Sequence, residues 1–532
     1  MKKENQSIIL LGLNIVIFLC ILPMIEPFYE LFFSADHFYF PAFFQDIWNR
    51  PHEISKWNLP PAPTFFPDGI IYLISLFLSL GNTIASIHIY AVIYTFLLCI
   101  FSIRTLQELQ DLEVWRIRII FLFCFAILLL FVILNQNNLL LLPLFITGHH
   151  GGSLLIAIAL LAFVLDKNFV INYKLVIPIT ILLIFARWND GIFLSVFMFP
   201  FLATVLLLSI FSFHLRKYSL LPTLIIAVLC ILIHPSKTFL INKFLSISVY
   251  QPEKLIWNGL KDKGIPKDLF WNDVISFIKT LPFYESGILL LGLTILMLSI
   301  LRSLYILLSE SRNLTKQQDT DRLVFKNIFF LVFIFLSVIT QLVSILLIQY
   351  TFSKDLLYAY RYYGPIFFLL FLMIPYSCMV LFSAFRGKNK IHALLGISLG
   401  VLLFISMNIL IPPFYNSKLK IYSNPILNCI QTHPELQYLL KGSFGVADYW
   451  LAKPVTVLSD NLIQIQAINN MQAYEWVGRN RILQDGDKFQ FAILGEGSRI
   501  SELPFLDKYR EPSERIFCSK FIFFLYKDER SF

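Results

Sequence analysis

Stretches of about 20 consecutive apolar residues recur along most of this chain of 532 residues. Hydrophobic residues make up 57% of it, charged residues only 14%, and the mean hydropathy is +0.71. A stretch of that length crosses a bilayer as a helix, whereas a soluble chain of this size would divide into several cores with polar surfaces. The sequence therefore predicts an all-α polytopic membrane protein in contact with membrane lipids.

The lysines and arginines explain the formal charge of +9 and indicate the topology. They gather in every second connection between apolar stretches, which is typical of cytoplasmic loops and gives no reason to expect nucleic-acid binding. With Lys2 and Lys3 inside, a first, uncleaved span ends on the outer side. About eleven spans of roughly 20 residues follow from this pattern. They are expected near residues 8–25, 84–103, 117–134, 151–166, 174–187, 191–213, 219–234, 286–308, 328–349, 364–383 and 392–412.

Two domains are expected, a transmembrane domain over residues 1–412 and an extracytoplasmic α/β domain over 413–532. The first includes the outside loops 28–66 and 235–283, the second of which contains no motif that we can interpret. The tail alternates short β-rich runs with a helical pattern and is long enough for a core of its own. Strands are expected at 444–447, 455–458, 489–494 and 521–526, and a helix at 433–441.

The cysteines divide in agreement with this topology. Five of them lie in apolar stretches, where a thiol behaves as a small hydrophobic group. Cys429 and Cys518 bracket the tail instead. Since the tail is expected in an oxidising compartment, we predict a disulfide between them.

Asp36 follows the first span and emerges at the outer membrane surface. A carboxylate is costly to place there and is more often functional than structural, so Asp36 is the candidate catalytic residue. The alternative is that it caps a turn before Pro41. A short amphipathic helix is expected over residues 41–50, lying on the membrane surface, with Asp46 and Arg50 paired one turn apart. For Asp68, capping of a helix that begins at Gly69 is favoured over a catalytic role.

Several other polar residues lie at expected outer ends of spans. His149 and His150, flanked by glycines, could contact substrate or be structural, and two histidines without nearby acids do not make a metal site. Arg187 and Asp190 share a tight turn, where they either neutralise each other or face a cavity as a phosphate ligand and a second acid. The other cations and the polar tail residues are Lys354, Arg361, Asp448, Tyr449, Trp450 and Lys453.

Arg361 is the preferred phosphate ligand, with Lys354 beside it, because a guanidinium binds phosphate through paired hydrogen bonds. The structural alternative is a belt of interfacial tyrosines with snorkelling cations. The Asp448–Lys453 stretch either contacts an acceptor or is a strand end with buried aromatic residues.

Four stretches resemble the C-type superfamily of membrane glycosyltransferases, in an uncharacterised bacterial branch. They are Phe65-Phe66-Pro67-Asp68, Gly148-His149-His150-Gly151-Gly152, Arg361-Tyr362-Tyr363-Gly364-Pro365 and Asp448-Tyr449-Trp450-Leu451-Ala452-Lys453. The order of an in-to-out span, an acidic outside loop, further spans and an outside domain is similar as well. The resemblance implies sugar transfer from a polyprenyl-phosphate donor at the outer face of a bacterial inner membrane.

The chemistry of such a transfer agrees with the residues present. An acceptor hydroxyl, on a glycan, lipid or protein, must lose a proton as it attacks the anomeric carbon, and Asp36 could take it. Phosphate leaves as a stable anion, so no second carboxyl is needed to protonate it. The family's loop often carries two adjacent acids, whereas here His37 follows Asp36. The sequence indicates no cofactor, and it leaves open whether the site binds a divalent cation.

Two alternatives belong to other classes. A transporter or flippase of lipid-linked substrates would also combine many spans with sparse intramembrane charge. A non-catalytic envelope assembly protein would use the loops and the tail for binding.

Overall fold

The computed structural model describes the residues that make up most of the chain. They are 12, 15, 33, 35–60, 62–110, 112–134, 144, 150–166, 173–210, 221–233, 248–249, 279, 283–310, 318–352, 356–384, 423–469, 472–474, 478–479, 488–495 and 502–531.

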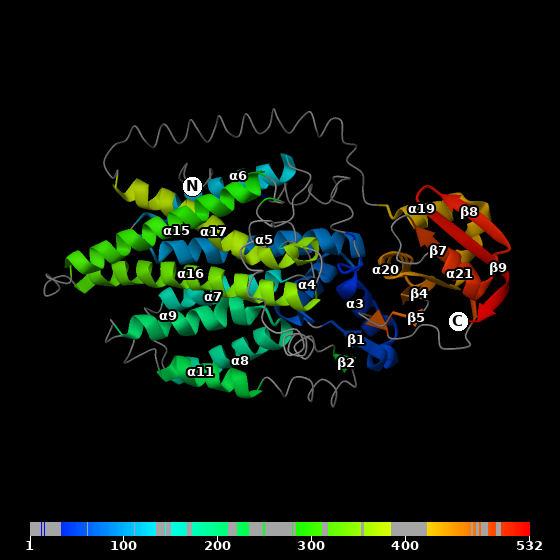
Figure 1. Ribbon diagram of the computed structural model, residues 1–532, viewed down its shortest axis with the longest axis horizontal. Coiled ribbons are helices and arrows are strands. Elements are labelled where there is room, and N and C mark those ends of the chain that lie inside the picture. Colours follow the sequence, from blue (N-terminus) through cyan, green and yellow to red (C-terminus); the bar gives the residue numbers. More distant parts are fainter. Residues whose placement is uncertain are drawn as a thin grey trace.

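A bundle of apolar helices forms the larger part of the molecule, and a smaller domain built on a sheet lies at one end of it (Figure 1). The bundle helices are α4 (Ile70–Leu78), α5 (Thr83–Gln107), α6 (Val114–Leu134), α7 (Gly151–Asp166), α8 (Tyr173–Asn189), α9 (Phe199–Ser209), α11 (Leu221–Ile233), α15 (Phe283–Glu310), α16 (Gln318–Phe352) and α17 (Leu356–Ala384). A short π-helical turn, η6 (Leu194–Met198), leads into α9.

Four helices in the described part of the chain are long and apolar enough to cross a membrane. They cover Thr83–Gln107, Glu285–Ser303, Leu323–Leu347 and Tyr362–Ser383. Each span expected between residues 84 and 383 coincides with a helix, although several are shorter than a bilayer is thick. The expected spans 8–25 and 392–412 lie outside the described residues, apart from 12 and 15. The total of eleven spans stays a prediction.

The helices pack through small residues and present apolar side chains outward. On α15, a Cβ at Gly292 would lie only 2.6 Å from the carbonyl oxygen of Leu370 on α17, so these two helices approach closely because a glycine stands there. Large apolar side chains such as Ile177, Val228 and Leu298 are more than half exposed. Such surfaces are expected where a helix faces lipid.

Charged residues link the helices at the bundle end remote from the smaller domain. Arg104 on α5 contacts Asp166 on α7 at 2.6 Å, and Lys326 on α16 contacts Glu108 at 2.7 Å. This is the end at which the positive-inside pattern places the cytoplasm.

A three-stranded sheet joins the three segments that the sequence places outside. Strand β1 (Trp57–Leu59) pairs in parallel with β2 (Ser248–Val249) and antiparallel with β6 (Gly478–Arg479). Because hydrogen-bonded strands are about 5 Å apart, the two loops and the tail lie on the same side of the bundle.

The first loop also contains the helix expected from its amphipathic pattern. This helix, α3, covers Tyr39–Asn49 and therefore begins two residues before Pro41. The 3-10 helix η3 (Pro51–Lys56) leads from it to β1, and the turn η4 (Phe65–Gly69) leads into α4. The α3 side chains Tyr39, Phe40 and Phe43 are buried in the bundle core, and the position of α3 at the membrane surface stays a prediction.

The C-terminal domain is α/β, as expected, with a six-stranded sheet in the order β5-β4-β3-β7-β9-β8. The strands β4, β3 and β7 are parallel, and the others join antiparallel. The elements are α19 (Pro425–Thr432), η8 (Pro434–Lys441), β3 (Ser443–Asp448), α20 (Tyr449–Leu458), β4 (Ile463–Asn469), β5 (Gln472–Ala473), β7 (Lys488–Gly495), α21 (Glu502–Tyr509), β8 (Glu514–Cys518) and β9 (Phe521–Ser531).

One expected strand of this domain was wrong. Residues 455–458 form the last turn of α20 although Val455, Thr456 and Val457 favour strands. The Asp448 carboxylate caps the helix by accepting from the Trp450 amide at 2.9 Å, Val455 is buried in the core of the sheet domain, and Val457 is buried against the bundle. Capping and burial outweigh a difference in intrinsic propensity that is small for each residue.

Cys429 on α19 and Cys518 at the end of β8 are joined in a disulfide, with their Cα atoms 6.0 Å apart. The bond closes a loop with a sequence separation of 89 residues. It attaches the first helix of the domain to the edge strand of its sheet.

We predict that the folded protein without reductant leaves Cys429 and Cys518 unlabelled by an alkylating reagent. The variant Cys429→Ser should gain one labelled thiol by mass spectrometry, at Cys518. Loss of a cross-link over a loop of this length should lower the stability of the domain by about 4 kcal/mol in denaturant unfolding. Two labelled thiols in the unreduced wild-type domain would contradict the assignment.

Candidate functional site

The candidate site lies at the bundle end that carries the C-terminal domain. Figure 1 shows α20 between α3 and the strands of the large sheet. Two separate groups of polar side chains lie there. We call the first the seam, formed by Asp36, Tyr39, Asp46, Tyr449 and Lys453. The second is the bundle-end cluster, formed by Asp68, Tyr90, His150, Ser153 and Asp190.

Asp36 is held in the seam by both parts of the protein. It lies in the turn before α3, where its carbonyl accepts from the Tyr39 amide at 3.3 Å. Tyr449, the first residue of α20, donates its hydroxyl to Asp36 Oδ1 at 3.2 Å. Asp36 remains partly exposed while its neighbours His37 and Phe38 are buried. A carboxylate that is oriented by a hydrogen bond and still reaches solvent can accept a proton from a bound ligand.

Lys453 is one helical turn along α20 from Tyr449 and supplies a cation to the seam. Its ammonium lies over the rings of Tyr39 and Tyr449, at 5.6 and 5.5 Å from the ring centroids. Burial lowers the pKa of Lys453 to about 7, and the charges of Asp36 and Asp46 oppose that shift. The charge of this ammonium therefore changes near neutral pH.

Asp46 completes the acidic side of the seam. Its carboxylate, 4% exposed, accepts from the Trp57 indole N–H at 3.0 Å, so β1 as well as α3 fixes its position. The pairing with Arg50 expected from their spacing is a backbone contact, from the Arg50 amide to the Asp46 carbonyl at 2.7 Å.

The capping role expected for Asp68 was wrong. No side chain caps α4; the Asp68 carboxylate accepts instead from the Tyr90 hydroxyl, at 2.7 Å, and from the Gly152 amide at the start of α7. Asp68 is 1% exposed. A Cβ at Gly152 would lie 2.7 Å from both Asp68 carboxylate oxygens, so glycine is what allows α7 to approach this acid.

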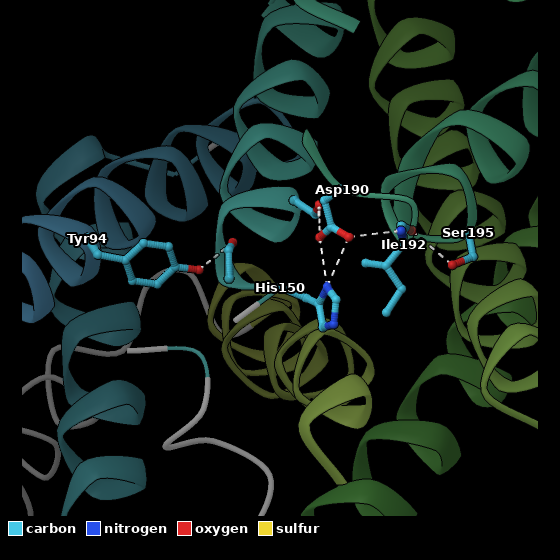
Figure 2. A network of polar contacts seen from close by, with 7 residues as sticks. Tyr94, His150, Asp190, Ile192 and Ser195 are labelled. Atoms are coloured by element: carbon cyan, nitrogen blue, oxygen red, sulfur yellow. Dashed lines mark hydrogen bonds and ion pairs between the residues drawn. The ribbon is translucent and has the colours of Figure 1, made fainter. Parts of the chain in front are cut away.

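Asp190 and His150 form a pair (Figure 2), and Asp190 is close enough to Asp68 to affect its charge. Nδ1 of His150 lies 3.0 and 2.9 Å from the two Asp190 oxygens. The Ser153 hydroxyl and the Ile192 amide also donate to Asp190, at 2.6 and 3.1 Å. The ring of Tyr362 stacks on His150 with the centroids 4.5 Å apart. A carboxylate at Nδ1 accepts the Nδ1–H, which leaves Nε2 of the neutral ring as a hydrogen-bond acceptor.

The two groups are separated by an aromatic layer. The Phe65 ring lies 6.2 Å from Tyr39 and 6.1 Å from Phe40, and Phe40 also contacts Gly69. The segment Phe65–Gly69 thus has the seam on one side and the bundle-end cluster on the other. Three of the four stretches that resemble the glycosyltransferase family meet in the bundle-end cluster, and the fourth forms part of the seam.

The candidate residues named from the sequence are therefore only partly brought together. His150 and Asp190 are in contact, while Asp36 belongs to the seam. Arg187, near Asp190 in the same turn, is 7% exposed. His149 and Lys354 lie outside the described residues, as does the side chain of Arg361, whose backbone belongs to α17.

Sequence reasoning missed the role of Asp68 and the position of Lys453 beside Asp36. One signal pointed to Asp68: it precedes a short, mostly apolar helix and has no neighbouring cation to neutralise it. Nothing local to Lys453 indicates that it lies beside a residue more than 400 positions earlier.

Among the described residues, the grouping of three metal-ligating side chains is Cys429, His433 and Cys518. Its two sulfurs are joined to each other in the disulfide, so they offer no thiolate to a metal.

Comparison of the chain with family profiles, with curated proteins and with solved structures finds no match.

We predict that Gly152→Ala destabilises the protein by about 1–3 kcal/mol, because its methyl group would overlap the Asp68 carboxylate and the Pro67 ring. The matched control is Gly287→Ala on α15, where nothing lies within 4 Å of the new Cβ. That change should be neutral or slightly stabilising. Thermal unfolding of the two purified variants compares them, and equal melting temperatures would contradict the close packing of Asp68 on α7.

Proposed function

We propose that the protein is an inverting glycosyltransferase that moves a sugar from a polyprenyl-phosphate donor to an acceptor hydroxyl at the outer face of a bacterial inner membrane. The observation that carries the proposal is the environment of the Asp36 carboxylate. It is a partly exposed carboxylate, oriented by Tyr449, at the junction of an apolar helical bundle and a polar domain. A lipid-linked donor and a water-soluble acceptor would meet at such a junction.

In the proposed reaction Asp36 takes the acceptor's proton as the acceptor oxygen forms a bond to the anomeric carbon. The bond from that carbon to the donor phosphate breaks with inversion, and the electron pair leaves on the phosphate. The Lys453 ammonium lies in the same seam as Asp36 and can donate a hydrogen bond to the bound acceptor.

The donor phosphate requires a cation, and we assign it to Arg361. Arg361 directly precedes Tyr362 on α17. The ring of Tyr362 stacks on His150 at the edge of the bundle-end cluster. His150 and Asp190 are less suited to phosphate contact than the sequence alone indicated. The Asp190 carboxylate lies there and would repel a donor phosphate. The role of the bundle-end cluster in the proposal is to hold α4, α7 and α8 in position under the site.

The strand pairing supports the proposed sidedness, because the two loops and the tail share one side of the bundle. The positive-inside pattern then places that side outside the cytoplasm.

We predict that Asp36→Asn lowers transfer by about 10²–10⁴-fold, because the amide keeps the shape of the side chain and cannot take the proton. The assay measures transfer by mass spectrometry with a panel of undecaprenyl-phosphate sugars. Asp460→Asn is the matched control: Asp460 is exposed, and its positive φ of 52° is one that Asn also tolerates. Full activity of the Asp36 variant would refute the base assignment.

A second candidate function is a transporter of lipid-linked substrates, which the buried acids of the bundle-end cluster favour. Ionisable residues inside a helical bundle are characteristic of proton relays. The two functions differ in product: a transporter moves the lipid-linked sugar across vesicle membranes without releasing polyprenyl phosphate, and it would lose activity with Asp190→Asn rather than with Asp36→Asn.

A further inference from the structure

We propose that the seam is a binding site for a neutral carbohydrate, so that the acceptor of the reaction is a glycan hydroxyl. The role of this carbohydrate as the acceptor rests on the proposed function. The carbohydrate-binding site itself rests on the residues of the seam alone. Its basis is the kind of hydrogen-bonding groups that α3 and α20 bring together and the aromatic rings that surround them.

The seam presents both acceptors and donors. Asp36 and Asp46 supply carboxylate oxygens, Lys453 supplies N–H groups, and the Tyr449 hydroxyl, which donates to Asp36, can accept through its oxygen. A sugar hydroxyl donates one hydrogen bond and accepts up to two, so a polyol is the ligand that satisfies both kinds of group at once. A phosphate has only acceptors to offer and would face two carboxylates against one ammonium, which disfavours it electrostatically.

A second observation is the Tyr39 hydroxyl, which lies in a residue only 3% exposed and has no hydrogen-bond partner within the described part of the protein. A buried polar group without a partner costs roughly 1–3 kcal/mol. The Tyr39 ring is directly under the Lys453 ammonium. A ligand hydroxyl or a water carried with it at this place would satisfy the phenol.

The third observation is a group of three aromatic rings beside these residues, of which Trp450 is the most exposed. Trp450 is 37% exposed, and its ring lies 5.3 Å from that of Tyr449, which in turn lies 5.5 Å from Tyr474. Flat apolar rings next to a few fixed polar groups are typical of small-ligand sites, and the C–H face of a pyranose packs on such rings.

The titratable groups that face Lys453 are Asp36 and Asp46 on the α3 side and the phenols of Tyr39 and Tyr449. Asp448, at the end of β3, is committed to capping α20. Since the pKa of Lys453 is about 7, the ammonium is present at pH 6 and mostly lost at pH 8.5. Hydrogen bonds from a charged donor to the ligand should therefore weaken over this range in the wild type.

The test is retention of the full-length protein, in nanodiscs, on an array of neutral and anionic bacterial envelope glycans. We expect retention on neutral glycans and about tenfold or greater loss with Lys453→Met and with Trp450→Ala, since each removes a direct contact. Two matched controls should bind as the wild type does. Lys508→Met removes another lysine that lies over a tyrosine ring, 4.8 Å from Tyr509, and Trp48→Ala removes a tryptophan that is 87% exposed outside the seam.

Lys453→Arg adds a readout that a purely structural lysine would not move. Arginine stays charged, so its variant should bind equally at pH 6 and pH 8.5, while the wild type weakens. Tyr39→Phe, which deletes only the unpartnered hydroxyl, is the mildest variant and guards against loss of folding as the cause.

The proposal is overturned if no neutral glycan is retained, if anionic glycans are retained in preference, or if the seam variants bind as the controls do. These outcomes are separable from the proposed function. Transfer that depends on Asp36 without seam-dependent glycan retention would leave a glycosyltransferase with another acceptor, and retention without any transfer would leave a glycan-binding membrane protein.

Discussion

The hydrogen bond from Tyr449 to Asp36 joins residues separated by 413 positions and connects the two sides of the seam. Neither partner makes a site alone: Asp36 is one acid in a turn, and Tyr449 is the first residue of a short helix. What places them together is a series of local determinants. The Asp448 cap starts α20 directly after β3, the sheet orients that helix, and the burial of Tyr39, Phe40 and Phe43 fixes α3 beneath it.

The seam and the bundle-end cluster stabilise their carboxylates in different ways. A carboxylate removed from water must receive hydrogen bonds or a counter-charge. Asp68 and Asp190 receive them from a tyrosine, a serine, an imidazole and backbone amides, and are sealed from solvent. Asp36 receives one from Tyr449 and stays partly exposed. The buried acids are suited to holding helices together, and the partly exposed one to exchanging a proton with a ligand.

How far the sequence predicted this arrangement depends on the range of the interactions involved. The apolar runs located the helices between residues 84 and 383, because the length of an apolar segment is a local property. The α/β character of the tail and three of its four expected strands followed from local patterns as well. Residues 455–458 did not, since the cap and the sheet contact that make them helical are not visible in their own composition. Asp68 was misassigned for a related reason: its partners Tyr90 and Gly152 come from other helices. Lys453 could be named from the sequence, but its neighbours could not.

The pairing of β1 with β2 and β6 limits the topology in a way that neither hydropathy nor charge does. Strands that share hydrogen bonds lie on one side of the membrane, so the chain must cross an even number of times between residue 59 and residue 248, and again between 249 and 478. The positive-inside pattern expects six spans in the first interval and four in the second, both even. Short helices such as α8 and α9 could be reassigned as re-entrant, but only in pairs. A topology that changes one span alone would put paired strands on opposite sides of the membrane. It would therefore break the three-stranded sheet and the connection between the first loop and the tail on which the seam depends.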